Sequence, residues 1–213
     1  MTEPRVYDIS PVLSPRTAVF PGDTAFSRDI LLSIDSGAHI DLSTIHTTVH
    51  VGAHADAPSH YVAGGATIEQ RSLHHYMGRC QVVDVRGPRG RRIARADIPV
   101  PIEAPRVLFR TGSFPDPDRW NTDFSALEPA LIEWLHDHHG VHLVGLDTPS
   151  IDLSTSKALP SHAVVAARDM AILEGVVLSA VPAGCYTLVA LPLPLEGADA
   201  SPVRAVLVDG PLT

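Results

Sequence analysis

The chain has 213 residues, enough for one large domain or two small ones, and its 45% hydrophobic content can fill a core. Its formal net charge of −8 argues against a nucleic-acid or polyanion partner. No run approaches the roughly 18 consecutive apolar residues of a membrane-spanning helix, so we expect no membrane partner either.

The first residues, MTEPRVYDISPVLSP, lack the basic start and apolar run of a signal peptide. Cys80 and Cys185 are far apart in sequence and are predicted to be reduced thiols, so we expect a soluble, cytoplasmic protein. Arg86 to Arg95 is the single basic run, and its glycines and proline favour a solvated loop.

Strand patterns outnumber helix patterns along the rest of the chain. The predicted strands are Gln81–Val85, Val107–Arg110, His142–Leu146, Thr187–Leu191 and Ala205–Val208. The predicted helices cover about Thr67 to Met77, the stretch from a Ser125-x-x-Glu128 capping box to His139, and about Ala163 to Leu173. Strands and helices alternate only in part. The sequence therefore predicts an α/β fold, a single mixed domain over residues 1–213, rich in strands, with a few helices around the sheet.

The stretch from His50 to His60 contains three histidines and one aspartate. Imidazole and carboxylate are preferred ligands of zinc and related metals, and the small residues between them leave room for the side chains to converge. A straight strand is excluded because it would place His50 and His54 about 13 Å apart. A helix is excluded because Asp56 would lie about 200° around from His50, and Pro58 would break the helix.

The motif is instead predicted to be a bent loop that follows a strand. Thr47-Thr48-Val49 is a β-prone approach, and Gly52 permits the turn. The alternative is a polar loop that is histidine-rich by chance, because the chain has 12 histidines. We interpret the cluster as the main indication of a metal-dependent enzyme.

The pattern His50-x-Gly52-x-His54-x-Asp56-x-Pro58-x-His60 resembles the signature of the cyclase superfamily of metal-dependent hydrolases. Further blocks extend the likeness nearly end to end and point to its kynurenine formamidase (arylformamidase) branch. These blocks are Val19 to Thr24, Gly145 to Asp152, Ser156-Lys157, Leu173 to Gly175 and Leu191 to Val206. The resemblance implies a cyclase-like swivelling β/β/α fold and a homodimer.

The resemblance also implies a site for two metal ions per subunit, usually zinc, with manganese or cobalt also accepted by such ligands. His50, His54 and Asp56 match the first ligand set of the family. His162 and Glu174 match the remaining positions. The residues alone would indicate only a histidine at a helix start and a carboxylate at a helix end.

His60 matches the acid/base residue of the family rather than a ligand. The implied reaction is hydrolysis of N-formyl-L-kynurenine to L-kynurenine and formate, a step of tryptophan degradation. Water activated at the metals attacks the formyl carbon. An imidazole has a suitable pKa range to take a proton from water and return it to the leaving aniline nitrogen.

Phe20 departs from the family pattern, which commonly has tryptophan there as a wall of the aryl pocket. Phenylalanine still stacks on an aromatic amide, so we expect Phe20 to contact substrate, with ordinary core packing as the alternative. Rival functions are an amide hydrolase that opens isatin, a non-catalytic metal-binding protein on the same fold, and a serine or cysteine hydrolase. The last rival lacks a Gly-x-Ser-x-Gly motif in this chain.

Overall fold

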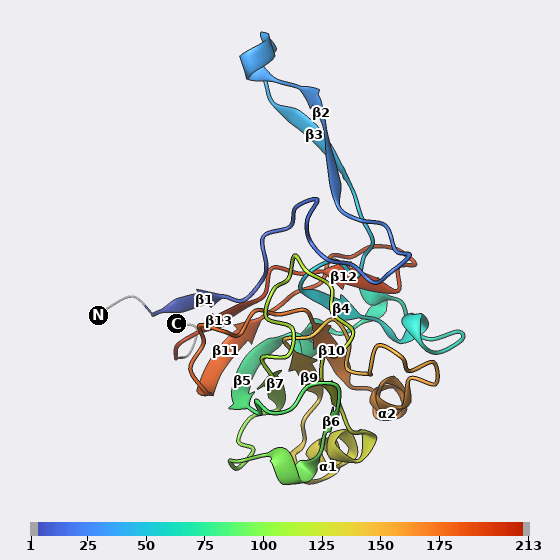
Figure 1. Ribbon diagram of the computed structural model, residues 1–213, viewed down its shortest axis with the longest axis vertical. Coiled ribbons are helices and arrows are strands. Elements are labelled where there is room, and N and C mark those ends of the chain that lie inside the picture. Colours follow the sequence, from blue (N-terminus) through green and yellow to red (C-terminus); the bar gives the residue numbers. More distant parts are fainter. Residues whose placement is uncertain (1–3, 211–213) are drawn as a thin grey trace.

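Residues 4–210, which the computed structural model describes, form thirteen strands and two α-helices (Figure 1). The strands are β1 (Val6–Asp8), β2 (Ser27–Leu32), β3 (Leu42–His46), β4 (His54–Asp56), β5 (Met77–Asp84), β6 (Arg92–Ile93), β7 (Arg106–Arg110), β8 (Ala126–Leu127), β9 (Leu143–Leu146), β10 (Ala171–Glu174), β11 (Gly184–Val189), β12 (Ala200–Pro202) and β13 (Val206–Val208). The helices are α1 (Pro129–His139) and α2 (Pro160–Ala167). Short 3-10 turns lie at Ile34–Ser36, Pro58–His60, Ile68–Gln70, Leu73–His75 and Arg95–Asp97.

Nine strands form one curled sheet in the order β1-β13-β11-β5-β7-β9-β10-β4-β12. The four central strands β5, β7, β9 and β10 are parallel, and the strands on either side pair antiparallel. α2 connects the parallel neighbours β9 and β10, as a crossover between parallel strands requires. The predicted strand-rich, mixed α/β domain is confirmed.

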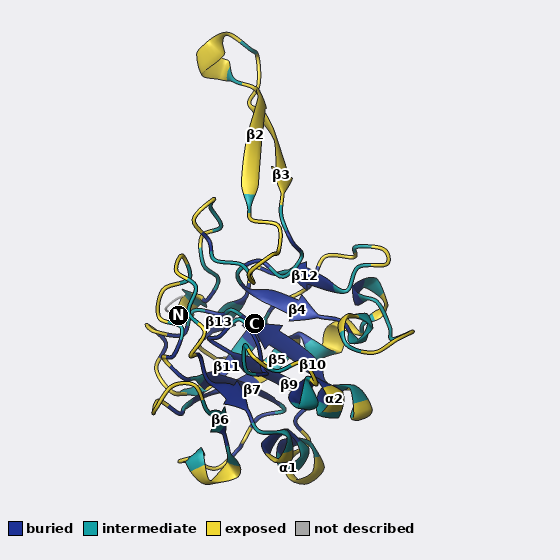
Figure 2. Cartoon of the chain, turned by 45° about the vertical axis from the view of Figure 1, so that its right-hand side comes forward, coloured by how far each residue is buried: buried dark blue, intermediate teal, exposed yellow. Residues whose placement is uncertain are grey.

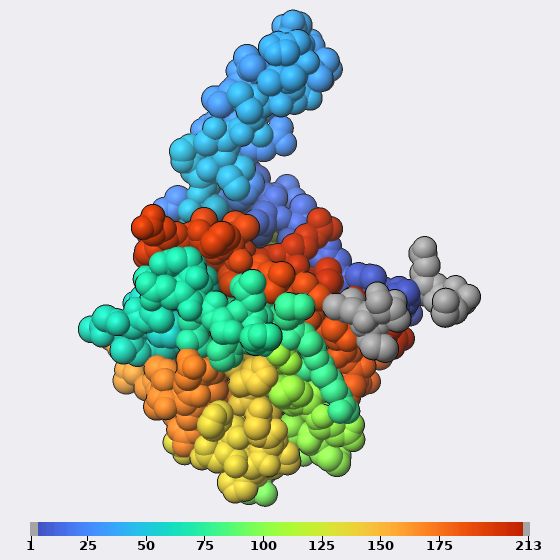
Figure 3. All heavy atoms as spheres, turned by 180° about the vertical axis from the view of Figure 1, so that it is seen from behind, coloured from blue at the N-terminus to red at the C-terminus, as the bar shows by residue number. Residues whose placement is uncertain are grey.

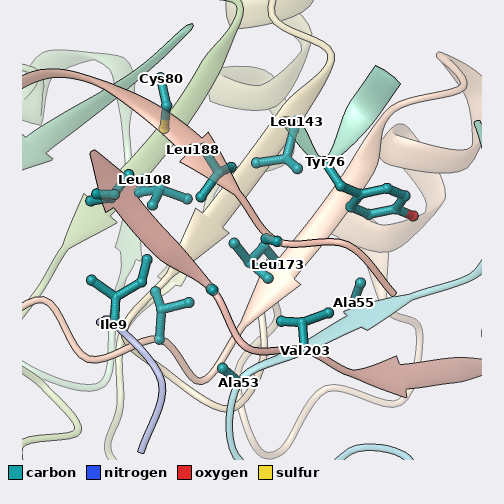
Figure 4. Close-up of a cluster of buried hydrophobic side chains, with 14 of the residues drawn as sticks. Ile9, Ala53, Ala55, Tyr76, Cys80, Leu108, Leu143, Leu173, Leu188 and Val203 are labelled. Atoms are coloured by element: carbon teal, nitrogen blue, oxygen red, sulfur yellow. The ribbon is translucent and has the colours of Figure 1, made fainter. Parts of the chain in front are cut away.

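The sheet separates two clusters of buried hydrophobic side chains, because alternate residues of a strand face opposite sides. Val83 and Val107 pack in the cluster that includes Leu135 of α1 and Val165 of α2. The other cluster contains the adjacent residues Val82 and Leu108. It also contains Leu173 and the small residues between the histidines of the His50–His60 motif (Figure 4). The motif is therefore anchored on this second core.

A hairpin of β2 and β3 extends away from the body of the molecule and stands clear of it when seen from behind (Figures 1 and 3). Every residue of its two strands is exposed (Figure 2). Its large apolar side chains are Ile30, Leu31, Leu32, Leu42 and Ile45. Two strands alone are only marginally stable in water, so these side chains indicate an interaction surface.

All five predicted strands are confirmed, as β5, β7, β9, β11 and β13, although β5 and β11 begin several residues earlier than predicted. The helix predicted over Thr67 to Met77 is wrong. Two 3-10 turns, Ile68–Gln70 and Leu73–His75, replace it. The Ser72 hydroxyl accepts a hydrogen bond from the backbone N–H of His74, and such local side-chain bonds favour a turn over a continuing helix.

The second helix ends as predicted, because Gly140 adopts the left-handed conformation (φ +63°) after His139. Its start is wrong. The capping box at Ser125 is not used, because Ala126–Leu127 pair with β6 as strand β8 and the helix begins at Pro129. Proline is favoured at the first helical position because its missing N–H has no partner there.

The third helix is displaced toward the N-terminus and is shorter than the predicted Ala163 to Leu173. Asp169 adopts a left-handed conformation (φ +48°) and ends the helical path. Ala171–Glu174 is instead the buried strand β10. Glu174 therefore lies at the end of a strand and not of a helix.

Both cysteines are free thiols, as predicted: Cys80 is buried and Cys185 is exposed. In the part of the chain that the structure describes, neither helix is long and apolar enough to cross a membrane.

Candidate metal centre and its cavity

Strand β4 presents His54 and Asp56 on one face, while Ala55 between them faces the hydrophobic cluster. Both side chains are 2% exposed. The neighbouring strand β10 places Glu174 opposite His54. The pairing of β4 with β10 therefore brings a carboxylate from far along the sequence to the histidine motif.

Two glycines allow the chain segments next to β4 and β10 to come this close. Gly52 (φ +58°) makes the turn that was predicted between His50 and His54, although His54–Asp56 form a strand and not a loop. A Cβ atom at Gly175 (φ +66°) would lie 2.1 Å from the carbonyl oxygen of Gly52. The chain that leaves β10 therefore passes the turn so closely that a side chain at Gly175 would force the two backbones apart.

Each of three histidines donates one ring N–H to an outer partner. The pairs are His50 Nε2 with Asp199 (3.0 Å), His54 Nδ1 with the carbonyl oxygen of Gly52 (2.9 Å) and His162 Nδ1 with Asp152 (2.8 Å). The second nitrogen of each ring then faces at least one of the buried carboxylates Asp56 and Glu174. The distances are His50 Nδ1 to Asp56 Oδ1, 3.1 Å; His54 Nε2 to Glu174 Oε2, 3.3 Å; and His162 Nε2 to Asp56 Oδ2, 3.6 Å. Outer hydrogen bonds of this kind fix the ring orientation of metal-ligating histidines.

The donor atoms converge closely enough to hold metal ions. Two groups share Asp56, and in each group the candidate ligand atoms lie within 4.8 Å of one another. The groups are His50, His54 and Asp56, and Asp56, His162 and Glu174. Asp56 Oδ1 is buried and has no hydrogen-bond donor among residues 4–210 while His50 donates through Nε2 to Asp199, because the nearby His50 Nδ1 then carries no proton. An unpaired buried carboxylate oxygen is costly, and a cation would compensate it, so these residues fit two neighbouring metal ions.

The electrostatics of the cluster also favour bound positive charge. Burial lowers the pKa of His50, but Asp56 and Asp199 outweigh burial and raise that pKa to about 9. Burial likewise lowers the pKa of His162, but Asp152, Asp56 and Glu174 raise it to about 10. The pKa of Asp56 lies well below its usual value despite burial, because His162 and His50 stabilise the anion. The carboxylates attract cations, either as protons or as metal ions.

His60 lies at the edge of this cluster, on the 3-10 turn Pro58–His60. Its Nδ1 donates to Asp199 Oδ2 (3.0 Å), the same oxygen that accepts the hydrogen bond from His50. The rings of His60 and His50 are 4.2 Å apart between centroids. The His60 side chain is 34% exposed and lines the cavity.

Asp199 and Asp152 are functional candidates that were not singled out from the sequence. Asp199 directly precedes β12, which pairs with β4, so it reaches the site through the sheet. Asp152 orients His162 and also pairs with Arg92 at 2.7 Å. Both aspartates lie within blocks that carry the family resemblance, which is the signal that would have identified them. The prediction of a solvated basic run is wrong for Arg92, whose side chain is only 23% exposed.

A cavity of about 460 Å³ opens over the cluster. The structure brings His50, His54, His60, His162, Glu174 and Phe20 together in its wall, while Asp56 lies buried behind them. Phe20 contacts Trp120 with ring centroids 4.6 Å apart, and Phe114 lies beside Trp120. The Phe20 side chain therefore lies in the cavity wall and not in the core, and Trp120 is an aromatic neighbour that was not predicted.

Comparison with solved structures shows that this fold is shared with known hydrolases. A protein described as a potential metal-dependent hydrolase with cyclase activity matches with a TM-score of 0.84 and 30% identity, over 98% of this chain and 100% of that chain. Isatin hydrolase A from Labrenzia aggregata matches with a TM-score of 0.82 and 22% identity, over 96% and 93% of the two chains. The fold and the hydrolase neighbours thus define a hydrolase class of enzyme, in which the convergent imidazole and carboxylate groups could hold a metal ion.

Sequence comparison narrows this class. The chain belongs to the putative cyclase family, whose model matches residues 7–153. It is also 44% identical over 209 residues to the kynurenine formamidase of Bordetella petrii, which covers 95% of this chain and 97% of that protein. The superfamily suggested by the histidine motif is therefore confirmed.

Proposed function

We propose that this protein hydrolyses N-formyl-L-kynurenine to L-kynurenine and formate, as a formamidase domain over residues 1–213 that acts in tryptophan degradation. The observation that carries the proposal is a buried imidazole–carboxylate cluster at the wall of an aromatic-lined cavity, in a chain 44% identical to a kynurenine formamidase. The reaction is cleavage of an aryl amide. Aromatic walls suit such a substrate because they stack on its ring.

The proposed metal ligands form two sets that share one carboxylate. His50, His54 and Asp56 would hold one ion, and Asp56, His162 and Glu174 would hold the second. We propose zinc, which prefers these nitrogen and oxygen ligands, with manganese or cobalt as substitutes. When bound, such ions polarise the formyl carbonyl and lower the pKa of water to around 7.

His60 is the proposed general acid and base. Asp199 holds its Nδ1, which leaves Nε2 to take a proton from the attacking water. An anilide anion is a poor leaving group, so His60 returns the proton to the aniline nitrogen as the carbon–nitrogen bond breaks. Phe20 and Trp120 orient the aryl ring and limit access of bulk water to the reacting carbon.

The function is tested by measuring N-formylkynurenine hydrolysis before and after chelation, and again after zinc, manganese or cobalt is added back. We expect activity to fall to background without metal and to return with it. Activity that survives chelation would indicate a serine or cysteine hydrolase. Bound metal without hydrolysis would indicate a binding protein. Faster turnover of isatin than of N-formylkynurenine would indicate an amide hydrolase that opens isatin. For that alternative, the 22% identity to isatin hydrolase A shows the fold alone.

We also propose a homodimer formed through the β2–β3 hairpin, and a cytoplasmic location, which the two free cysteines support. A second copy would cover apolar side chains that are now 38 to 62% exposed, such as Leu32 and Ile30. We expect light scattering to give about twice the 22.8 kDa chain mass. Ile30→Lys should yield a monomer, whereas Val12→Lys, at an exposed position outside the hairpin, should not. A wild-type monomer at micromolar concentration would contradict the dimer.

A further inference from the structure

Two arginines line the cavity of the metal centre and have no part in the chemistry proposed above. Arg110 ends β7, and Arg86 follows the neighbouring strand β5 by two residues. Both bind Asp84, the last residue of β5. Arg86 donates through Nε and Nη2 at 2.7 to 3.1 Å, and Arg110 donates through Nη2 at 2.5 Å.

This cluster of Arg86, Asp84 and Arg110 is positively charged. Burial raises the pKa of Asp84, but the two guanidinium groups outweigh burial and hold that pKa at about 2, so Asp84 is ionised at neutral pH. Two guanidinium charges against one carboxylate leave a net charge of +1. Asp23 and Asp147 also line the cavity, but within residues 4–210 both arginines form their ion pairs with Asp84 and not with these two carboxylates.

Of the two arginines, Arg86 has the exposed free edge. Arg110 donates through Nη1 to the carbonyl oxygen of Val181 and through Nη2 to Asp84, and its Nε is buried without a hydrogen-bond partner among residues 4–210. Arg86 binds Asp84 through one side of its guanidinium group, and no hydrogen bond from its Nη1 occurs within residues 4–210. The Arg86 side chain is 66% exposed, and its stem packs against Gly112. The free edge can therefore pair with an anion in the cavity.

The sheet sets the distance from this cluster to the metal centre. In the strand order β5-β7-β9-β10, Arg86 follows a strand that lies three strands away from Glu174. Neighbouring strands are about 4.8 Å apart, so the two backbones are about 14 Å apart across the sheet. In N-formylkynurenine the formamide and the carboxylate lie at opposite ends, roughly 8 Å apart. A long arginine side chain can span the remaining distance between the substrate carboxylate and the backbone.

We propose that Arg86, held in place by Asp84 and Arg110, binds the carboxylate of the substrate's amino-acid end. This assignment rests on the proposed function and extends it. It makes the enzyme selective for aryl formamides that carry an anionic group at the end remote from the formamide. The basic run predicted to be a solvated loop thus contributes a specificity residue through its first arginine.

The test compares Arg86→Ala with the wild-type enzyme on two substrates. These are N-formylkynurenine and the analogue in which hydrogen replaces its carboxylate. We expect Arg86→Ala to lower kcat/KM for N-formylkynurenine roughly 10- to 100-fold, mainly through KM, because a hydrogen bond to a charged group is lost. The analogue should lose much less. Arg86→Lys should lie between. Arg89→Ala, in the same run but paired with Asp123 outside the cavity, is the matched control.

The possible outcomes separate this assignment from the function on which it rests. Equal losses on both substrates, with unchanged metal content, would overturn the carboxylate role of Arg86 while leaving the formamidase function intact. A wild-type enzyme that turns over the analogue as efficiently as N-formylkynurenine would overturn it as well. Absence of wild-type turnover on N-formylkynurenine would overturn the proposed function, and the assignment with it.

Discussion

Asp56→Asn is expected to strip the protein of metal and to reduce N-formylkynurenine turnover more than about 100-fold. Loss of an outer partner of a metal ligand already costs roughly 10- to 100-fold, and Asp56 is the ligand that we propose for both ions. Asparagine keeps the size of the side chain but carries no negative charge. It therefore cannot balance two cations in a site whose Asp56 is 2% exposed.

The readouts for this variant are metal content by elemental analysis, the thermal unfolding midpoint and the rate. The matched control is Asp137→Asn, because Asp137 is an exposed aspartate paired with Arg168 on the surface. Asp137→Asn should keep metal and rate within about twofold, as surface substitutions do. If Asp56→Asn retained two ions and half its turnover, the shared-ligand assignment would be wrong.

The sequence predicts only those parts of this site that depend on the spacing of neighbouring residues. His54 and Asp56 share a strand face because they are two residues apart, which is visible from their spacing. Glu174 comes opposite His54 through the β4–β10 pairing, which no local pattern specifies. Asp199 arrives in the same way, beside β12. Glu174 could be predicted only through the family resemblance, and Asp199 was not predicted.

The same limit applies to the fold, in which only the elements with a clear local signal are predicted. Three of the four central strands, β5, β7 and β9, are predicted because each contains a short run of buried apolar residues, which is a local signal. The β2–β3 hairpin is missed because neither strand buries a face, so its sequence lacks the alternation that marks a half-buried strand. The apolar run that ends at Leu173 fits a helix or a buried strand equally well, and the left-handed Asp169 decides between them.

His60→Ala is expected to keep both metal ions but to lower kcat roughly 10²- to 10⁴-fold, the usual contribution of a general acid and base. The Nδ1 of His60 is occupied by Asp199, and its ring faces the cavity next to His50. Added imidazole should restore part of the rate, because a small molecule can then carry the proton. His74→Ala, at an exposed histidine outside the cavity, should change nothing.

Metal content decides between two roles of His60, because His50, His60 and Asp199 also lie close enough to hold an ion. If His60→Ala loses an ion together with its rate, and imidazole does not rescue it, His60 is a ligand and another group moves the proton. If metal stays and imidazole rescues, His60 moves the proton. Asp199→Asn should then cost less than His60→Ala, because an amide oxygen still accepts the hydrogen bond from Nδ1 and keeps the ring oriented.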